Sequence, residues 1–216
     1  DYRSSRGLGD VYKRQFDHLL FTGGTQIGKK VMKAASENLV PVTLELGGKS
    51  PVIVDEDANL SEVAKKVMRG KTMNAGQICL APDYLMLPKG KSKEFANASS
   101  EVIGEMFEDL KYNEDYTSVI NERHYERINE LVADAKEKGA EVLEINPADE
   151  DFEQQELHKI PPTLVLNPTD DMKIMQEEIF GPVLPVKEYD DFNETVSYVN
   201  SKERPLGLYL FSKDKD

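Results

Sequence analysis

The stretch Thr72–Pro82, which reads TMNAGQICLAP, contains the single cysteine of the 216-residue chain. One cysteine forms no disulfide within its own chain, so Cys79 serves either packing or reactivity. Gly76 permits a tight bend of the backbone before it, and Ala81-Pro82 ends any helix ahead of a strand expected over 83–87. A thiol at a tight turn, beside free backbone N–H groups, suits a nucleophile whose product carries an oxyanion. A buried structural cysteine is the alternative that this stretch alone leaves open.

A second stretch, Val42–Pro51 (VTLELGGKSP), places one carboxylate in an apolar run ahead of two glycines. Leu44 and Leu46 flank Glu45, and the partial desolvation expected there makes a carboxylate a stronger proton acceptor. Glu45 is therefore a candidate general base. A solvent-facing Glu at the end of a strand is the alternative.

A third stretch, 176–183 (QEEIFGPV), follows in order, and together the three motifs resemble the aldehyde dehydrogenase superfamily. The resemblance runs from about Phe16 to the last residue. Within the superfamily, Ala75–Tyr84 (AGQICLAPDY) is most similar to the branch that oxidises fatty, aromatic and coniferyl-type aldehydes. The fold that the resemblance implies is the α/β fold of aldehyde dehydrogenases, with Rossmann-like open parallel sheets and flanking helices, incomplete at both ends.

The activity that the resemblance implies is NAD(P)-dependent oxidation of an aldehyde to a carboxylic acid. Cys79 would attack the aldehyde as a thiolate and form a thiohemiacetal, then a thioester that water activated by Glu45 hydrolyses. NAD or NADP would be the cofactor and a small-molecule aldehyde the substrate, and no metal is expected. Two rival functions stay open, a thiol esterase that needs no cofactor and a non-catalytic relic.

The resemblance also implies a set of cofactor contacts, namely Gly23, Gly24, Leu46, Gly47, Glu178 and Phe180. The Glu178 carboxylate would accept hydrogen bonds from the nicotinamide ribose hydroxyls, and the Phe180 ring would pack beside the nicotinamide. Residues 46–47 would present backbone groups to the carboxamide. Residues 23–24 lie in a strand–turn–helix segment whose N–H groups favour phosphate, and in this family the turn lies near the nicotinamide end of the cofactor.

These assignments have structural alternatives. A helix that ends before Gly181-Pro182 would explain the Glu–Phe pair without a ligand, and glycine-rich turns open many helices that bind nothing. His124 and Arg127 stand where the family often has Gln and Lys at the cofactor, so their role is carried over only weakly. Lone histidines on helices more often face solvent than act, and we expect the same of His18 and His158.

The chain is expected to have three parts. Residues 1–15 show no period and no family counterpart, and we treat them as foreign to the fold. Residues 16–45 would be the C-terminal part of the NAD(P)-binding domain, and 46–216 the catalytic, thiol-bearing domain, truncated. The family's second oxyanion donor and its adenosine-binding residues would lie upstream. We therefore expect the chain by itself to be poorly active, since losing an oxyanion donor costs about 10²–10³ in rate.

Apolar periodicity places the elements. Strands are expected at 18–21, 51–54, 83–87, 140–145, 163–166, 183–186 and 206–212, and helices over 29–37, 60–68, 95–110, 125–135 and 191–200. Asp57 or Asn59 would cap the second of these helices, Gly139 would end the fourth, and Asn146–Glu156 reads as an acidic surface loop. Helices that alternate with short strands favour an α/β sheet that is mostly parallel.

Charge limits the partners. The chain has 27 Lys and Arg against 40 Asp and Glu, a formal charge of −13, which argues against nucleic acid and anionic membrane surfaces. No apolar run approaches the roughly 18–20 residues of a membrane span, and 1–15 has no signal-peptide pattern. One Cys and seven Met fit a reducing compartment. The sequence predicts a cytoplasmic protein, and the resemblance implies a homodimer.

Overall fold

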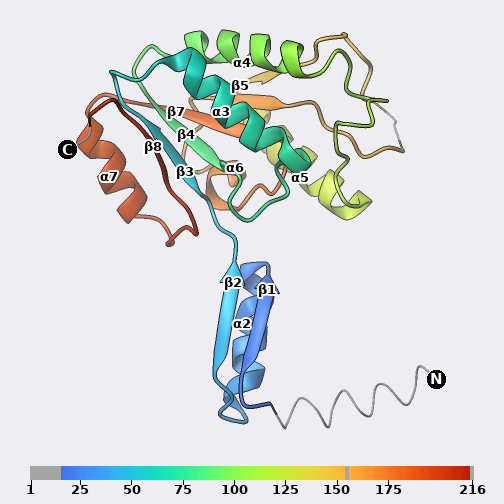
Figure 1. Cartoon of the computed structure of the whole chain (residues 1–216), viewed down its shortest axis with the longest axis vertical. Coiled ribbons are helices and arrows are strands. Elements are labelled where there is room, and N and C mark those ends of the chain that lie inside the picture. The colour runs from blue at the N-terminus through green and yellow to red at the C-terminus, as the bar shows by residue number, and fades with distance from the viewer. Residues whose placement is uncertain (1–15, 154–155, 215–216) are drawn as a thin grey trace. The chain divides into compact units, whose positions relative to one another are not determined.

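The computed structural model describes residues 16–153 and 156–214, and the chain divides into two compact units between Gly47 and Gly48 (Figure 1). The domain boundary expected from the sequence, between residues 45 and 46, lies two residues earlier. That these units are a cofactor-binding and a catalytic domain stays a prediction. The segment 1–15, expected to be foreign, lies outside the described residues.

The first unit is a β–α–β crossover. Its strands β1 (Leu19–Gly23) and β2 (Val42–Leu46) pair in parallel, and α2 (Thr25–Ser36) connects them. Gly28 lets α2 approach β2 closely, because a Cβ at this position would lie 2.8 Å from Cδ2 of Leu46. A larger residue would therefore require the Leu46 side chain to move or the helix to shift.

Helix α2 begins at Thr25, four residues before the expected start at Lys29. Gly24 has an extended conformation (φ −68°, ψ 146°) and serves as the N-cap, so the helix starts directly after the glycine pair. The expected strand–turn–helix arrangement is present, with a shorter turn.

The second unit is built on a six-stranded sheet in the order β5-β6-β7-β4-β3-β8. In chain order the strands are β3 (Pro51–Val54), β4 (Tyr84–Pro88), β5 (Glu141–Glu144), β6 (Thr163–Leu166), β7 (Val183–Tyr189) and β8 (Tyr209–Phe211). All neighbours pair in parallel except β5 with β6. The expected α/β fold with a mostly parallel sheet is confirmed, with one antiparallel strand at its edge.

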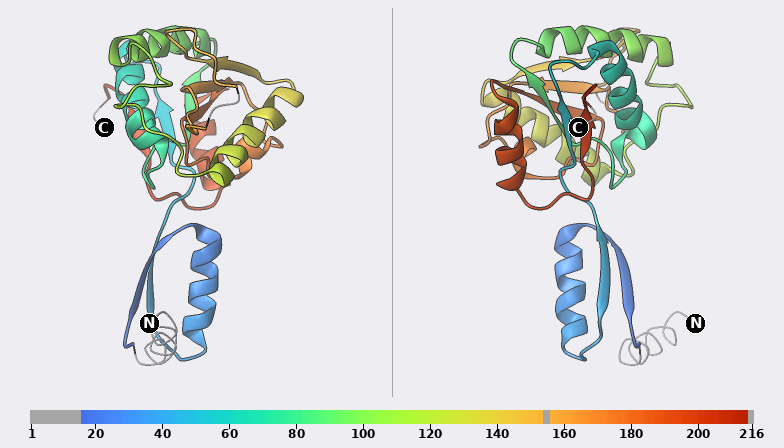
Figure 2. Two further views of the ribbon diagram at one scale, coloured as in Figure 1. Left: turned by 90° about the vertical axis from the view of Figure 1, so that its right-hand side faces the viewer. Right: turned by 60° about the vertical axis from the view of Figure 1, so that its left-hand side comes forward.

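Helices cover both faces of this sheet (Figure 2). They are α3 (Leu60–Thr72) and α4 (Ser92–Met106) on one face, and α5 (Glu122–Glu137), α6 (Lys173–Gln176) and α7 (Phe192–Asn200) on the other. Strand β4 shows why both faces are apolar. Leu85 and Leu87 pack into the α3–α4 core, whereas Tyr84 and Met86 pack into the α5–α6 core, because successive side chains point to opposite faces.

Several boundaries differ from the sequence predictions. Asn59 caps α3 as expected, accepting hydrogen bonds from the N–H groups of Ser61 and Glu62 at 3.1 and 3.3 Å. The next helix ends at Met106, before Leu110. The final strand, expected over 206–212, is limited to Tyr209–Phe211.

The loop after β5, expected to be an acidic surface loop, is anchored by hydrogen bonds over its described residues. The Glu150 carboxylate accepts the backbone N–H groups of Leu110 at 2.7 Å and Lys111 at 3.1 Å. Asn146 donates through its amide to the Glu150 carbonyl at 2.7 Å. The loop therefore ties the end of β5 to the segment after α4.

Two features are absent from residues 16–153 and 156–214. Within them, no helix is both long and apolar enough to cross a membrane. The same residues contain no group of three or more His, Cys, Asp or Glu side chains arranged to hold a metal ion.

Candidate active site

Cys79 follows a left-handed turn at the end of α3. Asn74 and Ala75 both have φ of 51°, and Gly76 has φ of 72°. Left-handed conformations are unfavourable for residues other than glycine by roughly 1–2 kcal/mol each, and such strain persists only where surrounding contacts hold it. The Cys79 side chain is half-buried, so a fully buried structural thiol, the alternative that the sequence left open, does not describe it.

Gln77 supplies much of the contact that holds this turn. Its side-chain amide donates to the carbonyls of Asn74 at 3.0 Å and Ser118 at 2.9 Å. Its side-chain oxygen accepts the N–H of Ile120 at 2.9 Å. Asn74 returns a bond from its own amide to the Gln77 carbonyl at 3.1 Å. The turn before Cys79 is thereby fixed both to itself and to the segment before α5.

A second contact joins the turn to the third motif. A Cβ at Gly76 would lie 2.3 Å from the carbonyl oxygen of Gly181, so the two backbones touch. The buried ammonium of Lys71 donates to the Pro82 carbonyl at 2.7 Å. This bond ties the end of α3 to the end of the segment that carries Cys79. The structure therefore brings the Cys79 turn and the segment after Glu178 together, although the two motifs are far apart in the sequence.

Helix α6 ends at Gln176, and Glu177 directly after it has an extended conformation (φ −112°, ψ 148°). The alternative of a helix ending directly before Gly181-Pro182 is therefore wrong. Ile179 is fully buried, whereas Phe180 is 38% exposed and has φ of 47°. Glu178 is half-buried, so the two candidate cofactor residues on either side of the buried Ile179 both retain access to solvent.

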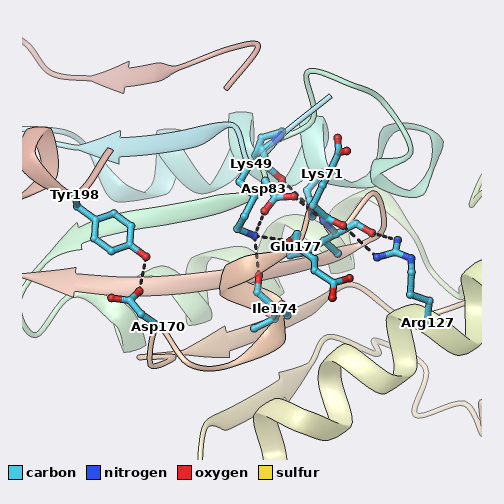
Figure 3. A network of polar contacts seen from close by, with 11 residues as sticks. Lys49, Lys71, Asp83, Arg127, Asp170, Ile174, Glu177 and Tyr198 are labelled. Atoms are coloured by element: carbon cyan, nitrogen blue, oxygen red, sulfur yellow. Dashed lines mark hydrogen bonds and ion pairs between the residues drawn. The ribbon is translucent and has the colours of Figure 1, made fainter. Parts of the chain in front are cut away.

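Side chains from three other segments hold the backbone of this stretch (Figure 3). Lys49 donates to the carbonyl of Glu177 at 2.9 Å, and the Asp83 carboxylate accepts the N–H of Ile179 at 2.8 Å. Arg127 donates to the carbonyl of Glu178 at 3.1 Å and also to that of Ile179. Arg127 therefore braces the backbone at Glu178 and Ile179, and its weak assignment to the cofactor stays a prediction.

The charged groups around this segment differ in the direction and cause of their pKa shifts. Burial raises the pKa of Glu178, opposed by a hydrogen bond from the Gly48 backbone and by the nearby cations of Arg127 and Lys49. Complete burial lowers the pKa of Lys71 to about 8, although Asp83 acts in the opposite direction. Burial likewise lowers the pKa of Arg127. The cluster therefore gathers charged groups in a desolvated environment, a feature of functional sites as well as of structural ion pairs.

The first unit carries the remaining sequence candidates. Glu45 is an exposed residue of β2 between the half-buried Leu44 and Leu46. The expected desolvation by these leucines is wrong, because their side chains point to the opposite face of the strand. Gly24 precedes α2, and a Cβ there would meet nothing within 4 Å. Glu45 and Cys79 belong to different units, so a shared role for them remains a proposal.

Gly23, Gly47 and Leu46 also belong to the first unit, where Leu46 ends β2 and Gly23 ends β1. Their assignment to the cofactor stays a prediction. Among the histidines, His18 is exposed as expected. His158 departs from expectation, since it is half-buried and its Nε2 lies 2.6 Å from Oε2 of Glu122.

Four residues that contribute to the site were not singled out from the sequence, namely Lys49, Lys71, Gln77 and Asp83. All four lie in or beside the motifs, and the charged ones are deeply or largely buried. A polar residue between apolar ones was the signal available, as for Asp83 between Pro82 and a buried strand. Its partners, Lys49 and Ile179, are remote in sequence and left no such signal.

An apolar cavity of about 380 Å³ lies beside the cysteine loop. Ile78 and Leu80, the two neighbours of Cys79, both line it, together with residues of α3 and the Phe211 ring. Both residues adjacent to Cys79 therefore form part of the cavity wall.

These features define a candidate nucleophilic cysteine site, in which the thiol follows a strained turn beside an open, mostly parallel sheet. Comparison with known proteins identifies the family to which the chain belongs. The sequence pattern of the Aldehyde dehydrogenase family matches residues 10–216, starting before Phe16. The chain belongs to the aldehyde dehydrogenase family.

Comparisons with individual relatives support the same family assignment. A probable coniferyl aldehyde dehydrogenase of Caulobacter vibrioides is 58% identical over 200 residues, covering 93% of this chain and 41% of its own length. The structure of substrate-bound AldH of Staphylococcus aureus has a TM-score of 0.84 at 40% identity, covering 95% of this chain and 43% of that chain. An NADP-dependent glyceraldehyde-3-phosphate dehydrogenase of Bacillus halodurans, complexed with NADP, has a TM-score of 0.82 at 31% identity, with coverage of 96% and 42%.

These comparisons confirm the resemblance found in the sequence, including its coniferyl branch. The chain spans less than half the length of these relatives, 41% to 43% of each.

Proposed function

We propose that this chain contributes the nucleophilic thiol and part of the cofactor surface of an NAD(P)-dependent aldehyde dehydrogenase, which oxidises an aldehyde to a carboxylic acid. The observation that carries the proposal is the backbone contact between Gly76 and Gly181, which sets the Cys79 turn against the Glu178–Phe180 segment. The name of the Caulobacter relative favours a coniferyl-type aldehyde as the substrate. A homodimer and a cytoplasmic location stay predictions.

Cys79 acts first in this proposal. Its thiolate adds to the aldehyde carbon, so that a C–S bond forms and the carbonyl electrons move to the oxygen. The backbone N–H of Cys79 would stabilise the resulting oxyanion together with a second donor. Because the turn before Cys79 is fixed by Gln77, the thiol is held in place before the substrate arrives.

The residues of the third motif fit a nicotinamide cofactor. The half-buried Glu178 carboxylate receives one backbone hydrogen bond, from Gly48, and an ionised carboxylate has further lone pairs for a ribose diol. The exposed ring of Phe180 offers an apolar surface two residues away. When bound, the nicotinamide supplies the two-electron acceptor that takes up the hydride. Gly23, Gly24, Leu46 and Gly47 of the first unit are the other proposed contacts.

Glu45 acts last. Once the former aldehyde carbon is a thioester on Cys79, Glu45 would take a proton from water, and the hydroxide formed would release the acid. The thiolate leaves and is ready for another aldehyde. An exposed Glu45 suits this step because it must reach water.

The test is to mix the complete protein with coniferyl aldehyde and NAD or NADP, and to follow reduced cofactor together with the mass of the Cys79 peptide after acid quenching. We expect turnover to be abolished by Cys79→Ala without loss of cofactor binding. Glu45→Gln should allow a single burst of reduced cofactor and accumulate the acylated Cys79 peptide. Full turnover in Cys79→Ala would contradict the proposal. Ester hydrolysis indifferent to NAD(P), without aldehyde oxidation, would instead support the thiol esterase.

A further inference from the structure

Asp83 is a buried carboxylate at the start of β4, 3% exposed, for which the proposed chemistry has no direct use. Its backbone N–H donates to the Ser50 carbonyl at 2.9 Å, which fixes the residue against the start of β3. One carboxylate oxygen forms an ion pair with Lys49, and the other accepts the N–H of Ile179 at 2.8 Å. Both oxygens are therefore engaged, as a buried carboxylate requires.

Lys49 extends the reach of this carboxylate. Besides Asp83, its ammonium donates to the carbonyls of Ile174 at 2.7 Å and Glu177 at 2.9 Å. The pair thus holds the N–H of the residue after Glu178 and the carbonyl of the residue before it (Figure 3). Charge-assisted hydrogen bonds such as these are shorter and stronger than neutral ones.

The backbone of Glu178 therefore has little conformational freedom. With both neighbours anchored, the Glu178 side chain leaves the backbone from a fixed position and varies mainly through its own torsions. A carboxylate that must meet two hydroxyl groups of one ribose benefits from such fixing, because less conformational entropy is lost on binding.

We propose that Asp83 is a positioning residue for the cofactor, which through Ile179 and Lys49 aims the Glu178 carboxylate at the ribose diol. This inference rests on the proposed function. It assigns to the Lys49–Asp83 pair a role in cofactor affinity rather than in the reactivity of the thiol, because the Cys79 turn is held separately by Gln77.

The decisive variant is Asp83→Asn in the complete protein. Asparagine keeps the shape but offers a single acceptor oxygen and no charge for Lys49. We expect the dissociation constants for NAD and NADP to rise by about tenfold or more, with a corresponding rise in KM for the cofactor and a smaller change in kcat. The rate of Cys79 alkylation without cofactor should not change, which a general loss of structure would not allow.

Glu150→Gln is the matched control, because Glu150 is also a partly buried carboxylate that accepts backbone N–H groups. It should leave cofactor affinity unchanged. If Asp83→Asn does not fold, Lys49→Met decides: cofactor binding weaker by about tenfold supports the inference, and unchanged affinity overturns it.

The two proposals fail in different ways. Unchanged affinity in a folded Asp83→Asn variant overturns the inference alone. A wild-type protein that binds neither NAD nor NADP overturns the proposed function, and this inference with it.

Discussion

The Cα of Gly76 lies against the carbonyl of Gly181 so closely that a Cβ would come within 2.3 Å of its oxygen. This contact joins the turn before the thiol to the segment that follows Phe180. A movement of either backbone therefore displaces the other.

Replacing Gly76 by alanine should be far more disruptive than the same change at another left-handed glycine. Gly90 has a similar φ of 80°, but a Cβ there would meet nothing within 4 Å. We expect Gly90→Ala to lower the free energy of unfolding by about 1–2 kcal/mol, from backbone strain alone. Gly76→Ala should cost about 1–3 kcal/mol more through the clash.

Chemical denaturation of both variants measures this difference, and alkylation of Cys79 shows whether the turn has moved. Equal losses of stability in the two variants would mean that the turn is not packed against Gly181.

Gln77→Glu should loosen the cysteine turn. Glutamate keeps an acceptor for the Ile120 N–H but sets a carboxylate oxygen against the carbonyls of Asn74 and Ser118. We expect the free energy of unfolding to fall by about 1–3 kcal/mol, with an altered rate of Cys79 alkylation. The control is Gln176→Glu, because Gln176 makes one exposed bond of 3.2 Å to the Asp170 carbonyl. A loss that is the same in both variants would contradict the role of Gln77.

Cofactor affinity should depend on the ionisation of Glu178. Burial raises the pKa of Glu178 above its ordinary value, and protonation removes acceptor capacity needed for the ribose diol. As the pH is lowered, affinity for NAD(P) should therefore start to fall at a higher pH than an ordinary Glu would give. Titrations over a range of pH measure this fall, and Glu178→Gln should remove it. The same pH profile in the variant and the wild type would show that another group is responsible.

Lys71 should make stability depend on pH in the alkaline range. Its pKa is lowered by burial from 10.5 to about 8, so the unfolded chain binds this proton more tightly than the folded one. The contribution of Lys71 titration to the free energy of unfolding is therefore fully present above pH 10.5, where Lys71 is neutral in both states. It is lost as the pH falls through the interval down to about 8.

Denaturation of wild type and Lys71→Met across this interval tests the sign. The stability of the wild type relative to the variant should rise with pH, by on the order of 3 kcal/mol in total. A constant difference between the two proteins would show that Lys71 titrates alike in the folded and unfolded states.

Local sequence signals predicted the strands and helices well where one period was long and its ends were marked. Helix α3 is an example, since its apolar spacing and the Asn59 cap are both local. The short strand β8 was overestimated, because an apolar run does not reveal which of its residues find a partner strand. Only Tyr209–Phe211 pair with β3, and Leu206 and Leu208 stay exposed.

The sequence indicated the motifs of the candidate site, but not the hydrogen bonds and ion pairs that hold them in place. Cys79 and Glu178 were predicted because their segments resemble those of a family, and their roles stay predictions. Asp83 was not, since its two partners are the Lys49 ammonium and the N–H of Ile179, 34 and 96 residues away in the chain. Glu45 shows the opposite error. Its apolar neighbours suggested burial, but alternation along β2 turns them away from it.

The burial of Asp83 and Tyr84 also changes what this pair can report about relatives. Both side chains are 2% to 3% exposed, and Tyr84 packs edge-on against Tyr198. A pair enclosed in this way is a marker of architecture rather than of a surface that a ligand could reach. Sorting relatives by their preferred aldehyde would then rely better on positions 78 and 80, which adjoin the thiol and face the apolar cavity.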